Sequence, residues 1–209
     1  MVPATARRWV SLPVLEFQVF SLNESLKMQH NIDWSSIFLE TFPQPGATNT
    51  DIVAATVGLM APLSAEEIAL ISQSKANPFP QGDALYASYR PFDPTTWAIP
   101  KRPLPPAYVS FLRWSNGGSF FNHDRRFDPF LSCSELRQYL IGYHFPQYVP
   151  GFVPFAFDGG GNVYVIDMRR ESDAGEYPIV FAKLGNLKYE NSKRVGISFI
   201  EVCAGHTNP

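Results

Sequence analysis

The stretch Phe152–Met168, FVPFAFDGGGNVYVIDM, decides the fold of this chain. It contains two strand-like runs joined by a polar, glycine-rich turn. Alternation of apolar residues places three side chains of the first run on one face: Val153, Phe155 and Phe157. The second run, Val163–Ile166, is β-branched and aromatic, as is typical of a strand.

The turn between the two runs reads DGGGN over residues 158–162. Glycine, Asp and Asn accept positive φ at little steric cost, which favours a hairpin. A phosphate cradle would instead require the glycines to lead into the N-terminus of a helix, where N–H groups are aligned. Because they lead into a strand-like run, we predict a β-hairpin in which Asp158 and Asn162 cap the turn by side-chain to backbone hydrogen bonds.

The composition is that of a globular protein with an aromatic core. The chain has 209 residues, of which 14% are aromatic and 17% are charged. A chain of this length can bury a core without disulfide bonds or structural metals. A net charge of −2 gives no electrostatic case for nucleic acid, which demands a basic face. The two cysteines, Cys133 and Cys203, are expected to be reduced and buried.

Neither a signal peptide nor a membrane span is predicted. Arg7 and Arg8 stand near the N-terminus, but Pro13 and Glu16 break the apolar run that follows them. The most apolar later stretch, residues 52–63, is too short to cross a bilayer. We therefore expect a soluble, cytoplasmic protein with no membrane partner.

We divide the chain into an N-terminal extension of unknown role, residues 1–50, and a domain over residues 51–209. Within the extension, the pattern predicts a strand over residues 12–22 and a short helix over residues 33–42. The domain carries a proline-rich insertion at about residues 75–106.

The insertion contains eight prolines, a density that rules out long helices and central strands. It also contains aromatic residues, which are rare in disordered linkers: Phe79, Tyr86, Tyr89, Phe92 and Trp97. We therefore predict an ordered segment that packs over the core.

Start and stop signals predict three helices in the domain. Capping-box patterns at residues 64–67 and 132–135 begin the first and third, and the first is expected to end near residue 74. Prolines 105–106 begin the second, which the sequence NGG at 116–118 ends.

Two more strands are expected, at residues 119–121 and 177–181. Pro178 argues that the second lies at a sheet edge or at a strand end. The tail, residues 195–203, has apolar spacings that fit a strand and a helix equally well.

This order of elements resembles the SUKH superfamily, and within it the Smi/Knr-type cell-wall-assembly-regulator branch. The resemblance covers about residues 60–205 and rests on SAEEI at 64–68, LPPAY at 104–108, FL at 111–112, NGG at 116–118, VP and DGGGN at 153–162, YP at 177–178 and SFIE at 198–201. It implies an α+β domain with a mixed or antiparallel sheet flanked by helices, a helical tail and a function without catalysis. Bacterial members look like immunity proteins that bind a nuclease or deaminase toxin, and fungal members look like regulatory scaffolds.

The residues themselves offer little for catalysis or metal binding. No i, i+4 histidine pair, HExxH or CxxC spacing is present, so we expect no metal and no cofactor. Cys133 lies between two serines at a predicted helix start, where the helix dipole would favour a thiolate. Nothing in the sequence supplies an oxyanion hole or an orienting third group, so we do not expect an enzyme.

A binding module needs exposed aromatic and acidic groups on loops beside a firm sheet. The segments 123–128 and 143–148 fit this description, together with the hairpin turn. The candidate partner-binding residues are Asp124, Asp128, Glu135, Tyr143, His144, Tyr148, Asp158 and Asn162. The alternative is that the aromatic rings pack beneath their own loops. The acidic groups would meet a basic nuclease, although Arg125 and Arg126 work against a purely acidic face.

Residues and resemblance together lead to one hypothesis and one alternative. The hypothesis is a cytoplasmic, monomeric or weakly dimeric immunity protein that binds and neutralises a cognate protein toxin and needs no cofactor. The alternative is an intracellular scaffold or adaptor on the same fold, in which the N-terminal 50 residues and the proline-rich insertion dock partners.

Overall fold

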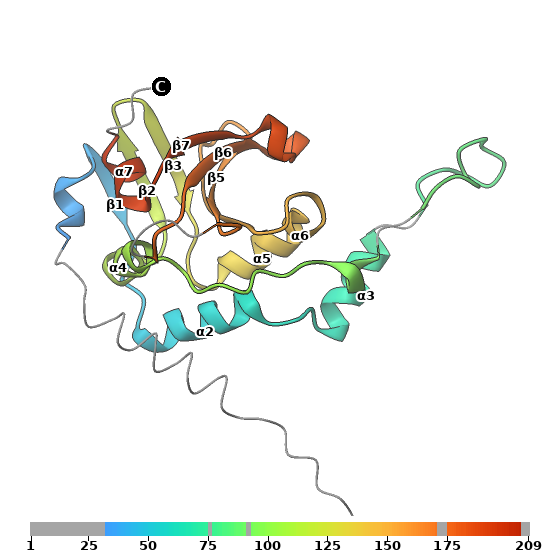
Figure 1. Ribbon diagram of the computed structural model, residues 1–209, viewed down its shortest axis with the longest axis horizontal. Coiled ribbons are helices and arrows are strands. Elements are labelled where there is room, and N and C mark those ends of the chain that lie inside the picture. The colour runs from blue at the N-terminus through green and yellow to red at the C-terminus, as the bar shows by residue number, and fades with distance from the viewer. Residues whose placement is uncertain (1–31, 75–76, 91–92, 171–174, 206–209) are drawn as a thin grey trace, which may run out of the picture. The chain divides into compact units, whose positions relative to one another are not determined.

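The computed structural model describes residues 32–74, 77–90, 93–170 and 175–205 (Figure 1). From Asp33 onward the chain forms one compact unit built on a single antiparallel sheet. The strands of the sheet are β1 (Glu40–Pro43), β2 (Gly118–Asn122), β3 (Arg125–Phe130), β4 (Phe152–Phe157), β5 (Asn162–Asp167), β6 (Ile179–Lys183) and β7 (Lys193–Gly196). Each strand pairs with its neighbour in chain order, so the predicted α+β fold is confirmed and its sheet is antiparallel throughout.

The described residues contain α-helices and short 3₁₀ turns around the sheet. The α-helices are α2 (Asn49–Met60), α3 (Ala65–Ser74), α4 (Pro106–Trp114), α5 (Glu135–Gly142), α6 (Phe145–Tyr148) and α7 (Phe199–Ala204). The 3₁₀ turns are η1 (Trp34–Ser36), η2 (Pro94–Thr96), η4 (Leu184–Asn186) and η5 (Tyr189–Asn191).

An aromatic core lies between the sheet and helices α4 and α7. Phe111 of α4 is fully buried, and its ring centroid lies 4.4 Å from that of Phe130 on β3. Phe199 of α7 packs against Tyr108 at 5.0 Å, and Trp34 meets Phe111 edge-on at 5.4 Å. Such pairs add about 0.5–1.5 kcal/mol each to the free energy of burial, so this cluster fixes both helices on the sheet.

The predicted hairpin is confirmed, because β4 pairs with β5 across the turn at residues 158–162. The prediction that Phe155 and Phe157 share a face of the strand is wrong. A bulge between Pro154 and Ala156 interrupts the alternation. Phe155 packs against α4 and α7, whereas Phe157 packs against Tyr139 of α5. Helices therefore cover β4 from both sides, and all six of its residues are buried.

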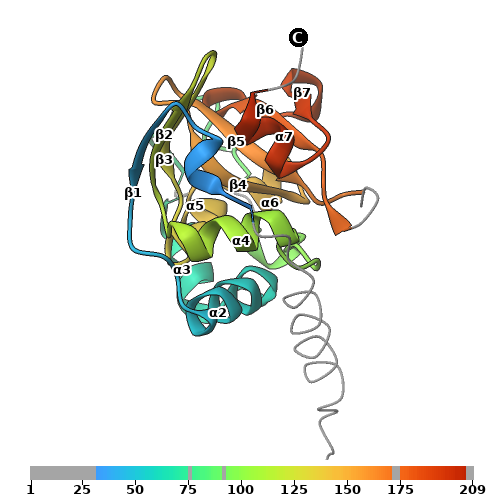
Figure 2. The same cartoon turned by 90° about the vertical axis from the view of Figure 1, so that its left-hand side faces the viewer.

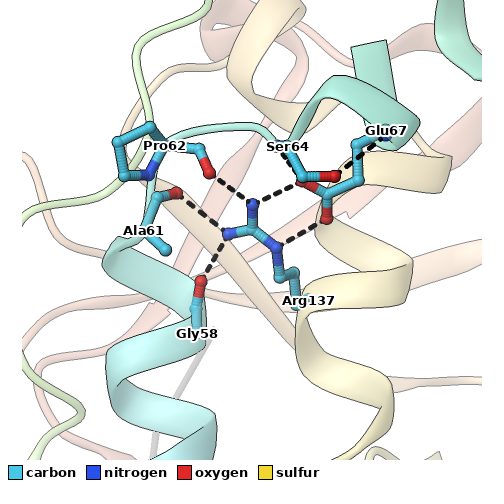
Figure 3. Close-up of polar contacts among 6 residues, drawn as sticks. All are labelled: Gly58, Ala61, Pro62, Ser64, Glu67 and Arg137. Carbon is cyan, nitrogen blue, oxygen red and sulfur yellow. Dashed lines mark hydrogen bonds and ion pairs between the residues drawn. The ribbon is translucent and has the colours of Figure 1, made fainter. Parts of the chain in front are cut away.

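The linker between α2 and α3 is fastened to α5 by one arginine (Figure 3). Arg137 donates to both carboxylate oxygens of Glu67, each at 2.7 Å. Its guanidinium also donates to three backbone carbonyls of the linker region: Gly58, Ala61 and Pro62. Carbonyls at the end of α2 that lack a helical partner are satisfied in this way.

The three predicted helices are present as α3, α4 and α5. The capping box of α3 is complete, since Ser64 N donates to Glu67 Oε2 at 2.8 Å and Glu67 N donates to Ser64 Oγ at 3.1 Å. Helix α4 begins at Pro106, as the proline pair predicts. The tail combines both readings that its spacing allows, with β7 followed by α7.

Two local predictions are wrong, and one lies outside the described residues. The helix expected over residues 33–42 is only the turn η1, after which Leu39 N donates to Phe121 O and the chain continues as β1. Pairing with β2 outweighs the weak local helical preference. The loop expected over residues 123–128 is a turn followed by β3. The strand predicted over residues 12–22 falls outside the described part of the chain.

The proline-rich segment has two parts of different character. In residues 94–105 the side chains of Pro94, Trp97 and Leu104 are buried. In residues 77–90 most side chains are exposed, and the hydrogen bonds run within the segment, as from Asn77 Nδ2 to Tyr86 O.

Within the part of the chain that the structure describes, no single helix has the length and apolar composition needed to cross a bilayer; α2 and α3, which meet at a bend of 61°, reach them only as a pair.

Candidate partner-binding surface

One side of strands β1–β3 carries exposed aromatic and charged side chains, and we call this surface the outer face. Its members are Glu40, Phe42 and Arg126, which are exposed, and Ser119, Phe121 and Asp128, which are half-buried. Register places them together, since Phe42 lies opposite Ser119 and Phe121 lies opposite Arg126. In Figure 2 these strands lie at the left, and helices are drawn only on their other side.

The aromatic part of the outer face is open to solvent. Phe42 is 55% exposed, and its ring meets that of Phe121 edge-on at 6.2 Å. The Arg126 guanidinium lies 5.6 Å from the centre of the Phe121 ring, which is within the range of a cation–π contact. The two rings and the cation therefore form a firm amphipathic surface on a sheet rather than on a loop.

Asp128 supplies a negative charge to this surface, and the exposed Glu40 opposite Phe121 supplies another. It accepts a hydrogen bond from Arg126 and another from Ser119 Oγ at 2.7 Å. The bond from Arg126 and the bond from Ser119 lower the pKa of Asp128, against a smaller opposing effect of burial. Asp128 is thus a charged acceptor at neutral pH, held in place and still 30% exposed.

The hairpin turn adjoins the outer face. Asp158 accepts hydrogen bonds from Gly160 N at 2.7 Å, Asn162 N at 2.9 Å and Asn162 Nδ2 at 2.6 Å, so the predicted capping of the turn is confirmed. Burial acts to raise the pKa of Asp158, but these bonds outweigh it and lower the pKa. A Cβ on Gly159 would lie 3.2 Å from the Arg126 guanidinium, so the turn rests against that cation.

Tyr143 lies beside Phe157, the last residue of β4 before the hairpin turn. Its ring is 41% exposed and lies 5.9 Å from that of Phe157, the residue before Asp158. Three of the predicted binding residues therefore lie at Arg126 and the hairpin turn: Asp128, Asp158 and Asn162.

The other predicted residues lie elsewhere. Glu135 accepts hydrogen bonds from Ser132 N and Oγ at 2.8 and 2.7 Å, so its charge serves the start of α5. The His144 ring lies 5.3 Å from the indole of Trp97, and the Tyr148 ring lies 6.3 Å from that of His144. Asp124 is 66% exposed in the turn between β2 and β3.

Sequence reasoning missed the residues that connect this surface, namely Phe42, Phe121 and Arg126. The available signal in RRFDPF over residues 125–130 was Phe127 standing between polar residues, as in a strand that buries one face. The segment 123–128 was instead interpreted as a loop that presents acidic and aromatic groups.

The structure does not support a reactive thiolate at Cys133. The side chain is 8% exposed, and burial raises the pKa of its thiol to about 11. Helix α5 begins at Glu135, and the Cys133 N–H donates to Asn116 Oδ1 at 2.8 Å rather than pointing at a free helix end. Among the residues described, no three His, Cys, Asp or Glu side chains are grouped so that they could hold a metal ion.

Comparison with known families gives a match over about half of the chain. The model of the SMI1 / KNR4 family (SUKH-1) matches residues 101–203, which run from the segment before α4 to α7. The match includes β2–β7, the hairpin turn and most of the outer face, whereas β1, α2 and α3 precede it. Comparison with curated proteins finds no match.

Proposed function

This chain belongs to the SUKH superfamily, and from that premise we propose that it is an immunity protein that neutralises a cognate toxin by binding it. The toxin is a nuclease- or deaminase-type effector, and the bound chain covers its active site. The role needs no cofactor and no catalysis. It is exercised in the cytoplasm by a monomer or a weak homodimer.

The observation that carries the proposal is the outer face. It joins the exposed Phe42 ring, the half-buried Phe121 ring, a cation and an ionised carboxylate on a continuous sheet, with the hairpin turn at its border. Aromatic residues and arginine supply most of the binding energy at protein interfaces. A rigid sheet also presents them with little loss of conformational entropy on binding.

The carboxylates at the outer face and the hairpin turn suit binding rather than chemistry. Asp128 and Asp158 each have a lowered pKa and fixed hydrogen-bond partners, as expected for charged groups that serve structure or recognition. A general acid working near neutral pH would need a raised pKa and a free path to substrate.

A second candidate function rests on the segment 77–90. Leu85 is 52% exposed and Tyr86 is 38% exposed, beside α3 and away from the outer face in sequence. Exposed apolar residues on a proline-rich segment are typical of docking elements in adaptors. This candidate would make the chain a regulatory scaffold on the same fold.

Co-expression with the product of the adjacent upstream gene tests the first proposal. We expect the upstream product to be toxic alone, cells to survive with both proteins, and the two to purify as one complex. A harmless upstream product that forms no complex would shift the assignment to the scaffold, for which Leu85→Ser with Tyr86→Ser is the first variant to examine.

A further inference from the structure

A second surface lies apart from the outer face. Strands β3, β5, β6 and β7 and the first half of α7 line an open depression of about 560 Å³. It is lined mainly by Arg125, Phe181, Lys193, Arg194, Ile197 and Glu201. Asp124, the predicted binding residue that the outer face does not include, stands on its rim.

The walls of the depression are fixed by a buried cation. Arg125 is 8% exposed, and its guanidinium donates to Val202 O at 3.1 Å and to Val195 O at 3.3 Å. These bonds tie β7 and α7 to β3, because Arg125 belongs to β3 and the two acceptors belong to β7 and α7. The depression is therefore preformed rather than opened by the motion of a loop.

The charges around the depression are unbalanced. Its two carboxylates already face internal donors: Asp124 Oδ1 lies 3.9 Å from Arg125 Nε, and a Glu201 carboxylate oxygen accepts the Ile197 N–H at 2.6 Å. Lys193 and Arg194 are both exposed, and neither forms an ion pair with any residue that the structure describes. The positive charges of Lys193 and Arg194 at the rim would therefore favour an anionic ligand.

Apolar side chains stand beside these cations. Ile197 is 60% exposed at the end of β7, and Phe181 and Val195 line the wall below it. A ligand that satisfies the whole depression must therefore combine carboxylates with an aliphatic side chain.

We propose that this depression binds an acidic, apolar peptide segment of a partner protein, with carboxylates against Lys193 and Arg194 and an aliphatic side chain against Ile197. The proposal is independent of the immunity role, since it concerns a different surface from the outer face.

The charges favour a peptide over a nucleic acid. A phosphate backbone needs a stripe of cations that follows its charges, whereas the rim has two exposed cations. The Asp124 carboxylate, 66% exposed, would repel each further phosphate. A glutamate or aspartate side chain of a peptide can contact Lys193 and Arg194 without lying next to Asp124.

The test is an NMR titration of the ¹⁵N-labelled full chain with a synthetic peptide that alternates glutamate and leucine. We expect saturable shifts at residues 193–197 and at Arg125, which weaken as salt is added. The comparison ligands are the same peptide with lysine in place of glutamate and an oligothymidylate. Shifts of similar size at residues 193–197 with either comparison ligand, or no saturable shift with the glutamate peptide, would overturn the proposal.

Two variants and one control show whether the peptide binds in the depression. Lys193→Glu with Arg194→Glu should weaken the glutamate peptide about tenfold, since it replaces two attractive rim pairs with two repulsive ones. The matched control is Arg170→Glu with Lys188→Glu, which makes the same change of charge at exposed positions outside the depression and should bind like the wild type. Ile197→Ser leaves all charges in place and should weaken binding about fivefold through its apolar contact alone. If neither Lys193→Glu with Arg194→Glu nor Ile197→Ser changed the affinity for the peptide, the peptide would bind elsewhere.

Discussion

Arg137 on α5 and Glu67 on α3 form a two-pronged ion pair, with both nitrogen-to-oxygen distances at 2.7 Å. Side-chain exposures of 21% and 26% place the pair half-buried, where it is screened less than a surface pair. Glu67 also completes the capping box of its own helix with Ser64. One residue pair therefore couples the start of α3, the end of α2 and the middle of α5.

Replacing Arg137 should destabilise the domain strongly. Arg137→Met removes the ion pair and leaves the Gly58, Ala61 and Pro62 carbonyls without this donor, so we expect a loss of about 2–4 kcal/mol of unfolding free energy. Urea unfolding followed by circular dichroism measures it. Arg126→Met, which removes an arginine that is 55% exposed, should cost under about 1 kcal/mol. Equal losses in the two variants would contradict the structural role of Arg137.

The environment of Glu176 should make the unfolding free energy depend on pH in a specific way. Its Oε1 accepts the Ala107 N–H at 3.0 Å, and its carboxylate also meets the backbone N–H of Phe199, so it joins the first turns of α4 and α7. Burial raises the pKa of Glu176 above 4.5, although both backbone bonds oppose the rise. With a raised pKa in the folded state, its stabilising contribution is complete below pH 4.5 and is lost as the pH rises through the folded value.

The variant Glu176→Gln keeps the shape of the side chain but cannot ionise. Its unfolding free energy should therefore not show the decrease that ionisation of Glu176 causes in the wild type. We compare the unfolding free energies of the variant and the wild type at each pH. As the pH rises from 4.5, the variant should become more stable relative to the wild type, and the difference should then level off. Carboxylates with lowered pKa, such as Asp128 and Asp158, titrate in both proteins and cancel in the difference. A difference that is flat with pH would show that Glu176 ionises equally in the folded and unfolded chains.

Cys133 should react slowly with alkylating agents. With a pKa near 11 and 8% exposure, its thiolate is scarce at neutral pH and poorly reached. Mass spectrometry after iodoacetamide treatment should find Cys133 and Cys203 unmodified in the folded protein and both modified in urea. Cys133→Ser should leave toxin neutralisation unchanged in the co-expression assay. Fast alkylation of native Cys133, together with loss of function in the serine variant, would revive a thiol-dependent activity.

Local signals in the sequence predicted the elements whose structure is decided locally. The capping box at Ser64 and Glu67, the Pro106 helix start and the Asp158 turn all depend on atoms within a few residues, and all are present. Elements decided by distant partners were missed. β1 forms because its backbone pairs with the distant strand β2, as in the pairing of Glu40 with Phe121.

The candidate surface shows the same division. Asp128 and Asp158 were predicted because charged residues in polar segments are visible in a sequence. Phe42 was not, because its exposure results from the position of β1 at the edge of the sheet with nothing described outside it. Hydrophobic residues are presumed buried until the fold shows which faces are covered.

The last prediction tests the outer face itself. Phe42→Asp places a charge on the exposed ring position of β1, which should weaken toxin binding at least tenfold, or by about 1.4 kcal/mol or more. Because Phe42 is 55% exposed, the unfolding free energy should change by less than about 1 kcal/mol. The matched control is Leu70→Asp on α3, where the leucine is 66% exposed and outside the outer face, and it should bind like the wild type. Isothermal titration calorimetry with the co-purified toxin measures both variants. If Phe42→Asp and Leu70→Asp bound the toxin equally well, the interface would have to lie on another surface of the domain, and the depression beside Lys193 would be the next to test.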